Sequence, residues 1–238
     1  MTLSAAERIS PQRTISSPAI MPIRKKSMAM IASSADFSVI TEGAELYLDA
    51  SGNNASAESA AKSGAVSAYA KSDAEAMDTV RRYLSLMPQN NLSPLPEFEF
   101  DAPVSAAFDN AENAAESIAD AGSILEVYGE YGTASYTALC TVSGVTAGIA
   151  ATNKTKDKLT SADCSKIARF VRTCDAYAIP VVTFVDTEGF KADDDTEAYG
   201  AVKDMAKLCH AYAEATTIKL AVVTGKAYGP AFIALAGK

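Results

Sequence analysis

The sequence predicts an α/β fold with a largely parallel sheet. Short β-branched runs alternate with helical patterns along the second half of the chain, which is typical of parallel strands joined by helices. Each of the last two runs leads into glycines, as strands do where they end in tight turns. The chain has 238 residues, 48% hydrophobic and 21% charged, so it is long and apolar enough to bury a core.

Residues 1–27 are expected to form a disordered or non-homologous N-terminal segment. They contain five basic residues, one acidic residue (Glu7) and three prolines. An Arg- and Ser-rich, acid-poor start is also typical of a transit peptide, but we favour a disordered tail. Ordered structure is expected from about Met28 onward.

Residues 28–86 are expected to form the remnant of a first half. Strands are predicted at residues 38–40, 45–48 and 65–69. A helix at residues 55–63 should stop at Gly64, and a second at 73–85 should be capped by Asp73. The second helix has apolar residues at helical spacing, namely Ala76, Met77, Val80 and Leu84.

Residues 87–104 are predicted to be an extended linker, because they hold four prolines and an acidic FEFD segment. Residues 105–238 should then form a second half. Its predicted helices cover residues 111–121 and 161–178, and its predicted strands cover 124–128, 136–142, 145–150, 181–185 and 218–224. Ser143-Gly144 is a hairpin turn signal.

The candidate site lies where the last two strands end. The strand at 181–185 leads to Asp186 and Gly189-Phe190, and the strand at 218–224 leads to Gly225 and Gly229. A strand that delivers a glycine turn to a helix N-terminus presents free backbone N–H groups. Such a turn can hold a developing negative charge without a catalytic side chain.

Composition and charge argue against several classes of function. The net charge of −8 argues against nucleic acid as a partner, and no apolar run approaches the roughly 18–20 residues of a membrane span. The chain has a single histidine and four cysteines without C-x-x-C spacing, which argues against a metal site. Scattered thiols suggest a reducing compartment, so a cytoplasmic location is expected.

Three blocks in the C-terminal quarter resemble a known family. They read KIARFVRTCDAYAIPVVTFVDTEGF, EAYGAVKDMAKLCHAYAEAT and KAYGPAF. All three are similar to the carboxyltransferase (β) subunit of biotin-dependent acyl-CoA carboxylases, which include acetyl- and propionyl-CoA carboxylase and related decarboxylases. Weaker similarity extends back to residue 28, through SADFSVITEGAELYLDA and GSILEVYGEYGTASYTALCTVSGVTAGIAATN.

The resemblance implies a crotonase-like fold of ββα units, here a partial first half and a partial second half. It implies transfer of a carboxyl group between carboxybiotin on a carrier protein and the α-carbon of an acyl-CoA, with no metal. The implied partners are the biotin carboxyl carrier protein, biotin carboxylase and further carboxyltransferase subunits, whose halves meet around the active site. One glycine turn would bind the enolate oxygen of the acyl-CoA and the other the ureido oxygen of biotin.

By this resemblance Gly229, Pro230 and Ala231 form the turn for carboxybiotin. Family members carry a small residue where Pro230 stands, and proline has no N–H to donate. The surrounding substrate-binding candidates are Asp186, Gly189, Phe190, Tyr228 and Ile233.

Each candidate also has a structural interpretation. Asp186 either shapes the biotin pocket or caps its own turn, and we favour the cap. Phe190 either packs on biotin or in the core, and Ile233 lines the acyl pocket or, by default, the core. His210 is expected to be a helix-packing or surface histidine. Residues 193–195 are expected to be a solvated loop rather than a cation site.

Two alternatives to an active carboxyltransferase remain open. The sequence has no glycine before Gly43, where the acyl-CoA turn is expected, and it stops at Lys238 inside a helix. We therefore expect a chain that is incomplete at both ends, and an inactive fragment with an assembly role is one alternative. Another crotonase-type enzyme, such as an enoyl-CoA hydratase, is the second. It would need an acidic pair near the glycine turns, and the sequence shows none.

Overall fold

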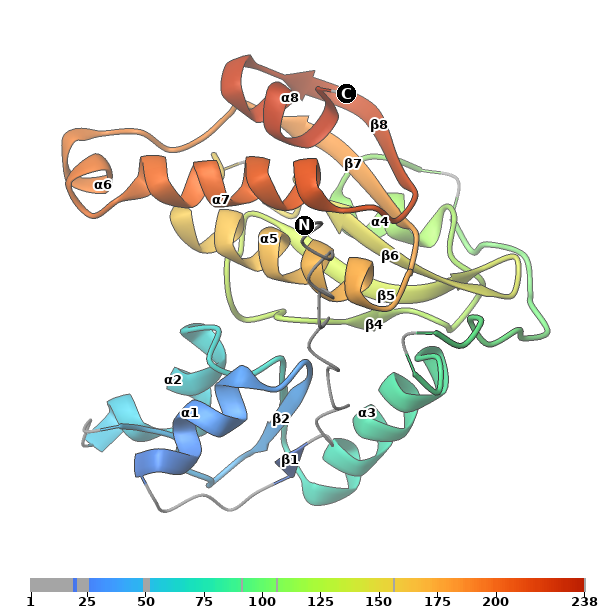
Figure 1. Cartoon of the computed structure of the whole chain (residues 1–238), viewed down its shortest axis with the longest axis vertical. Helices are drawn as coiled ribbons and strands as arrows, with labels where there is room; N and C mark the ends of the chain where they lie inside the picture. Colours follow the sequence, from blue (N-terminus) through green and yellow to red (C-terminus); the bar gives the residue numbers. More distant parts are fainter. Residues whose placement is uncertain are drawn as a thin grey trace, which may run out of the picture.

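A computed structural model describes residues 19–20, 26–48, 52–90, 92–105, 107–155 and 157–237. These residues form two bodies, each built on its own sheet (Figure 1). The first, which we call the N-terminal body, holds a three-stranded sheet, and the second, the C-terminal body, holds a five-stranded sheet.

The N-terminal body is a small parallel sheet with helices around it. Its elements are β1 (Ala19–Ile20), α1 (Lys26–Ser34), β2 (Ser38–Thr41), a 3-10 turn (Gly52–Ala55), α2 (Ala57–Lys62), β3 (Ala68–Ala70) and α3 (Asp73–Leu86). The strand order is β1-β2-β3, and both pairings are parallel. Strand pairing therefore begins upstream of Met28, where order was expected to start; the rest of residues 1–25 lies outside the described part.

Two local expectations for this body were wrong, and one helix was missed. Helix α1 was not predicted, because its apolar residues are consecutive, from Met28 to Ala32, and mark no single helical face. Residues 45–48 form no strand: Glu45 makes one isolated bridge to Ser56, which is too little for a ladder. The cap of α3 is Ser72, whose Oγ accepts from the N–H of Glu75 at 3.2 Å, and Asp73 is the first helical residue.

The buried face of α3 is also turned relative to the prediction. Its buried residues are Ala76, Val80, Tyr83 and Leu86, whereas Met77 and Leu84 are exposed. These buried residues recur at helical spacing, but they include the aromatic Tyr83, which the prediction did not count among the apolar residues.

The C-terminal body is a mixed sheet in the order β4-β5-β6-β7-β8. Its strands are β4 (Leu125–Glu126), β5 (Tyr136–Val142), β6 (Val145–Ala151), β7 (Val181–Thr187) and β8 (Lys219–Ala227). The first three strands are antiparallel and the last three parallel, so this sheet is less parallel than expected. The predicted hairpin explains the difference: Ser143 and Gly144 have φ of 50° and 79°, as a tight turn between β5 and β6 requires.

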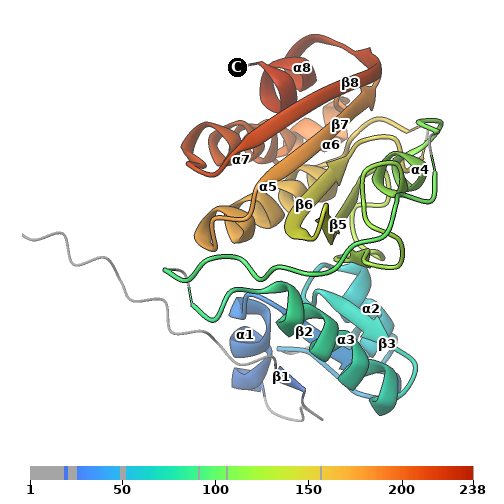
Figure 2. The same cartoon turned by 90° about the vertical axis from the view of Figure 1, so that its right-hand side faces the viewer.

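Helices cover both faces of this sheet (Figure 2). They are α4 (Ala111–Glu116), α5 (Ser161–Ala176), α6 (Asp194–Ala198), α7 (Ala201–Glu214) and α8 (Gly229–Ala236). Side chains of β5 and β6 alternate between a cluster with α4 and the main core around α5. Helix α4 ends at Glu116, five residues before the predicted 121.

The main core spans both bodies. Phe37 and Tyr83 stack with their ring centroids 4.1 Å apart and belong to the same buried cluster as Ile167 and Val171 of α5. The Arg169 side chain crosses between the bodies, as described below. The proline-rich stretch runs alongside, where the N–H of Phe98 donates to the carbonyl of Gly144 at 2.8 Å.

Three cysteines are buried and Cys209 is half-buried, all as free thiols. Within the described ranges, no helix is long and apolar enough to cross a membrane.

Candidate functional site

The site lies at the edge of the sheet where the parallel strands β7 and β8 both end (Figure 2). Thr187 is paired with Ala227, which brings the two glycine turns together. Glu188, in the first turn, and Lys226, near the end of β8, form an ion pair with an N–O distance of 2.6 Å. The arrangement follows from the topology, because adjacent parallel strands such as β7 and β8 have their carboxyl ends at the same end of the sheet.

The second turn has the geometry of an anion site. Tyr228 is the N-cap of α8, and its side chain makes no cap hydrogen bond. Gly229 is exposed, has φ of 52°, and has no atom within 4 Å of the place where a Cβ would lie. Pro230 follows in the first turn of the helix and brings no N–H. The exposed N–H of Gly229 is therefore the donor that this positive end of the helix presents, because Ala231, the next residue with an N–H, is fully buried.

The first turn does not have that geometry, and this corrects the expectation of two donor turns. The N–H of Gly189 is engaged by Thr187 Oγ1 at 3.2 Å, and its carbonyl accepts from the N–H of Leu159 at 3.0 Å. No helix follows directly, since α6 begins only at Asp194. Gly189 has φ of 109°, and a Cβ on it would lie 3.9 Å from the carbonyl oxygen of Tyr228. Gly189 therefore lies next to the second turn and offers it no N–H donor.

Asp186 links the two strands and does not cap its own turn, which corrects the interpretation that we favoured. Its Oδ1 accepts from the backbone N–H of Lys226 at 2.7 Å, and its Oδ2 accepts from Asn153 Nδ2 at 2.9 Å. The pairing of β7 and β8 is irregular at this residue, between Val185 and Thr187. Asp186 thus holds the last residues of β8 in line for the turn that follows.

Gly225 lies within β8, not at its end as expected. A Cβ on Gly225 would lie 2.4 Å from Asp186 Oδ1, far inside van der Waals contact. Glycine is needed here because the carboxylate occupies the space of a side chain. Sequence reasoning missed Asn153 and Lys226, although both lie in blocks that carry the family resemblance, Asn153 at the end of GIAATN and Lys226 at the start of KAYGPAF.

The remaining candidates surround the turn. Phe190 pairs with Leu159 and packs against the main core, in keeping with a core role. Ile233 is 66% exposed, so the default of a core residue was wrong. It lines an apolar cavity of about 270 Å³ between α7, β8 and α8. Tyr228 is also exposed.

Two other features of the sequence lie away from this edge. His210 is on the surface of α7, with Nδ1 2.8 Å from Glu214 Oε2, as expected of a surface histidine. Asp193 is the N-cap of α6, so residues 193–195 belong to a helix start and not to a loop. Across the part of the chain that the structure describes, no three His, Cys, Asp or Glu side chains could hold a metal together.

The sequence and the fold match one group of proteins. The Carboxyl transferase domain family matches residues 18–238. Methylmalonyl-CoA decarboxylase subunit alpha of Propionigenium modestum is 33% identical over 193 residues, which cover 74% of this chain and 37% of that protein. The propionyl-CoA carboxylase beta chain of Roseobacter denitrificans is 33% identical over 198 residues, covering 74% and 38%. The chain therefore spans well under half the length of these relatives.

A solved structure agrees with this match. The transcarboxylase 12S hexamer, crystallised with hydrolysed methylmalonyl-coenzyme A, superposes with a TM-score of 0.79 at 28% identity. The aligned region covers 86% of this chain and 46% of the transcarboxylase chain.

Proposed function

Because the chain belongs to the carboxyl transferase family and has its crotonase-type α/β fold, we propose that it moves a carboxyl group between carboxybiotin and the α-carbon of an acyl-CoA. The observation that carries the proposal is the uncapped first turn of α8, which lies open at the edge where β7 and β8 end. Small acyl-CoA esters are the proposed substrates, since two relatives are named for propionyl-CoA and methylmalonyl-CoA.

The turn fits the ureido group of biotin. Carboxybiotin supplies the carboxyl group, and its ureido oxygen gains negative charge as that group leaves. The exposed Gly229 backbone leaves room for such an oxygen, and the Gly229 amide offers it a hydrogen bond. Each donor of this kind is typically worth about 3 kcal/mol of barrier.

Pro230 limits the strength of this turn. A residue with an N–H at this position would add a donor between Gly229 and Ala231. Proline does suit the first turn of a helix, because an N–H there has no partner within the helix. We therefore expect Pro230 to preserve the shape of the turn and to reduce its charge stabilisation.

The acyl-CoA turn is not assigned to any described residue. Gly189 donates internally, and the sequence has no glycine before Gly43. We assign the turn at Gly229 to the carboxybiotin side of the reaction. Its proposed partners are a biotin carboxyl carrier protein, biotin carboxylase and further carboxyltransferase subunits, and its proposed location is the cytoplasm.

A second candidate is an assembly piece without activity of its own. It is favoured by the loss of a donor at Pro230 and by β8, which is an exposed edge strand in the described sheet. Leu220, Val222 and Val223 of this strand are all exposed apolar residues, as an interface would require.

A carboxyl exchange assay separates the two. The purified chain is incubated with free biotin and methylmalonyl-CoA, and propionyl-CoA is measured by chromatography. Wild type should form propionyl-CoA, and Pro230→Gly should keep or raise the rate. A clear fall in Pro230→Gly would refute the idea that proline removes a useful donor. No product from folded wild type would leave the assembly role.

Gly229→Ala tests the turn directly, with Gly43→Ala as its matched control. Both glycines have positive φ and open space at the Cβ position, so both variants pay about 1 kcal/mol of backbone strain. Only Gly229→Ala places a methyl group where the ligand approaches. We expect its rate to fall at least about ten-fold, with Gly43→Ala unchanged; equal rates would remove Gly229 from the site.

A further inference from the structure

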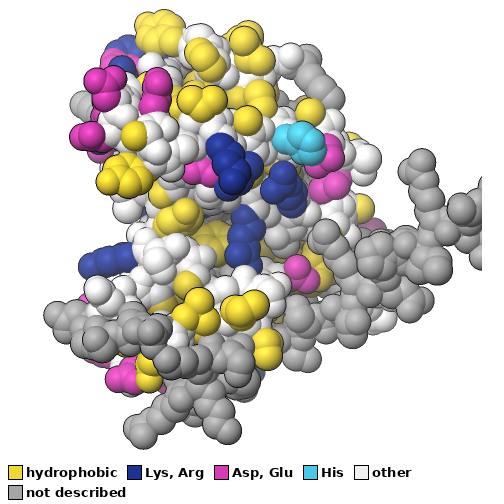
Figure 3. Space-filling model, turned by 60° about the vertical axis from the view of Figure 1, so that its left-hand side comes forward, with side chains coloured by type: hydrophobic (Ala, Val, Ile, Leu, Met, Phe, Trp, Pro, Cys, Tyr) yellow, Lys and Arg dark blue, Asp and Glu magenta, His cyan; other side chains and the backbone are white. Residues whose placement is uncertain are grey.

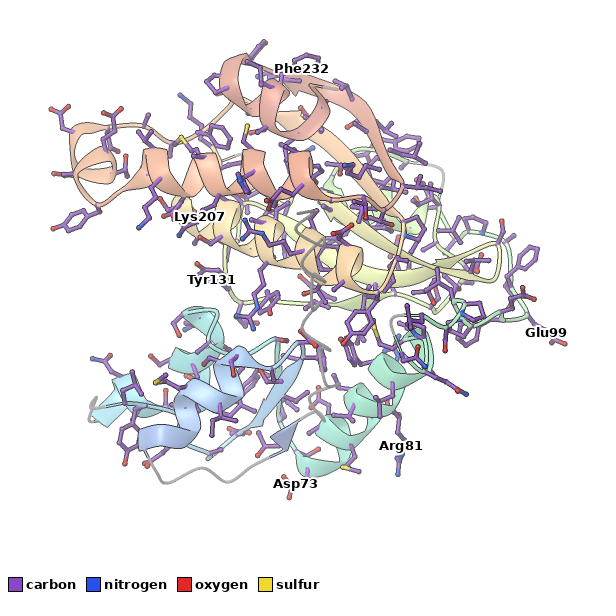
Figure 4. The ribbon with its side chains drawn as sticks, viewed as in Figure 1. Asp73, Arg81, Glu99, Tyr131, Lys207 and Phe232 are labelled. Carbon is purple, nitrogen blue, oxygen red and sulfur yellow. The ribbon has the colours of Figure 1, made fainter. Side chains whose placement is uncertain are left out.

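A polar hollow lies in the crease between the two bodies, away from the glycine turns. Its volume is about 470 Å³, and it is walled by the end of α1, one face of α5, and Lys207 of α7. Figure 3 shows Lys and Arg side chains gathered over this crease. Figure 4 places Lys207 on the side of α7 next to α5. The basic residues that line it are Arg169, Arg172 and Lys207.

Arg169 forms the structural wall of this hollow. Its guanidinium donates to the carbonyls of Ser33 and Ala35 at 2.7 and 2.9 Å, and lies 5.7 Å from the ring centroid of Tyr128. The guanidinium thereby neutralises the negative end of α1, which would otherwise repel an anion.

Arg172 is the free charge in the hollow. Among the described residues its guanidinium has no ion pair or hydrogen bond. One carboxylate, that of Asp36, also lines the hollow, and it accepts from the Tyr177 hydroxyl at 2.9 Å; Asp175 on α5 accepts from the N–H of Thr216 at 2.6 Å. Three basic side chains, those of Arg169, Arg172 and Lys207, thus line the hollow against the one carboxylate of Asp36.

Lys207 adds a second charge. It pairs with Asp204 at 2.7 Å, but its side chain stays 46% exposed and lines the hollow. Ser165 and Thr173 of α5 also line this wall, where Thr173 Oγ1 donates to the carbonyl of Arg169 at 3.1 Å. Arginine binds phosphate through two N–H groups and lysine binds it as a point charge, so this set suits a phosphate oxyanion.

We propose that the hollow binds a phosphate-bearing small anion. The ligand group is the phosphate itself, which a free phosphate ion and a phosphorylated nucleotide share. The cavity is large enough for either. The proposal does not rest on carboxyl transfer, because none of its residues belongs to the glycine turns.

The test is a calorimetric titration of the whole chain at constant ionic strength, with inorganic phosphate in one arm and adenosine 3′,5′-bisphosphate in the other. Saturable binding is expected in at least one arm. Arg172→Gln and Lys207→Gln should each weaken it about ten-fold or more, the usual effect of losing a charge-assisted hydrogen bond. Tighter binding of the bisphosphate would identify a nucleotide site, and equal binding a site for the phosphate alone.

Lys203→Gln is the matched control, because Lys203 is exposed on the same helix and does not line the hollow. It removes the same charge and should leave binding unchanged. The three variants change exposed residues, so circular dichroism should show native folding in each. Absence of saturable binding, or equal losses in all three, would overturn the proposal. Self-association that depends on Arg172 without phosphate binding would also overturn it, in favour of an interface between copies of this chain.

Discussion

Substitution of Gly225 by alanine should destabilise the chain through one contact. The new Cβ would lie 2.4 Å from Asp186 Oδ1 and 2.5 Å from its Cγ. Ordinary contact begins near 3.4 Å, so the carboxylate must move by about 1 Å. That shift breaks its 2.7 Å hydrogen bond from the N–H of Lys226. The residue does not have positive φ, so backbone strain contributes nothing.

The expected cost is about 3 kcal/mol. A hydrogen bond to a charged group contributes about 1.5–3 kcal/mol, and overpacking costs about 1–3 kcal/mol. Alanine offsets about 0.5 kcal/mol of this by restricting the unfolded chain. Urea unfolding followed by far-UV circular dichroism measures the difference, which suits a chain without tryptophan.

A double-mutant cycle isolates the contact. In an Asp186→Ala background the carboxylate is gone, so Gly225→Ala should cost less than about 0.5 kcal/mol. The coupling between the two changes should then be about 2–3 kcal/mol. Gly200→Ala is the control, because its φ is positive and its Cβ position is open, and it should cost about 1 kcal/mol in both backgrounds. Equal costs of Gly225→Ala in both backgrounds would refute the reasoning.

Three further predictions concern the rest of the fold. Burial lowers the pKa of Lys166 from 10.5 to about 8, so the unfolded chain binds the proton more tightly than the folded chain does. The free energy of unfolding should therefore rise by about 3 kcal/mol between pH 8 and 10.5. Lys166→Met should lose this rise, and an equal pH dependence of unfolding in urea for wild type and variant would contradict the prediction. Arg169→Lys should lower stability by about 2 kcal/mol, since one ammonium cannot replace a guanidinium that holds the carbonyls of Ser33 and Ala35 at the end of α1. An unchanged melting temperature would count against that bridge. Cys209 alone should react with a thiol reagent in the native chain, because the other three thiols are buried; fast reaction of more than one thiol would disagree with the structure.

Much of the architecture follows from local patterns. The β-branched runs mark β5 to β8, and Ser143-Gly144 marks the hairpin, because turn geometry depends on a few adjacent residues. The weak predictions lie in the alanine-rich N-terminal body. The apolar residues of α1 are consecutive and mark no single helical face, so this helix was missed, and residues 45–48 were predicted as a strand that the structure does not form. The division into residues 1–27, 28–86, 87–104 and 105–238 stays a prediction.

The candidate site was only partly predictable for a different reason. Glycine turns are visible in the sequence because positive φ demands glycine, and both Gly189 and Gly229 have it. Whether a turn offers its N–H groups depends on nearby acceptors. Thr187 engages the N–H of Gly189, while the side chain of Tyr228 leaves the start of α8 uncapped. This difference between the two turns cannot be predicted from the spacing of glycines in the sequence.

The sequence by itself determined the α/β alternation, the family resemblance and the place of the glycine turns, because these depend on residues close together in the chain. Only the tertiary structure decided that Asp186 reaches the backbone of Lys226, forty residues later, and that Gly225 leaves room for it. It also brought Arg172 and Lys207 into one hollow. Such contacts are set by the register of parallel strands and by helix packing, which bring together residues that no local pattern connects.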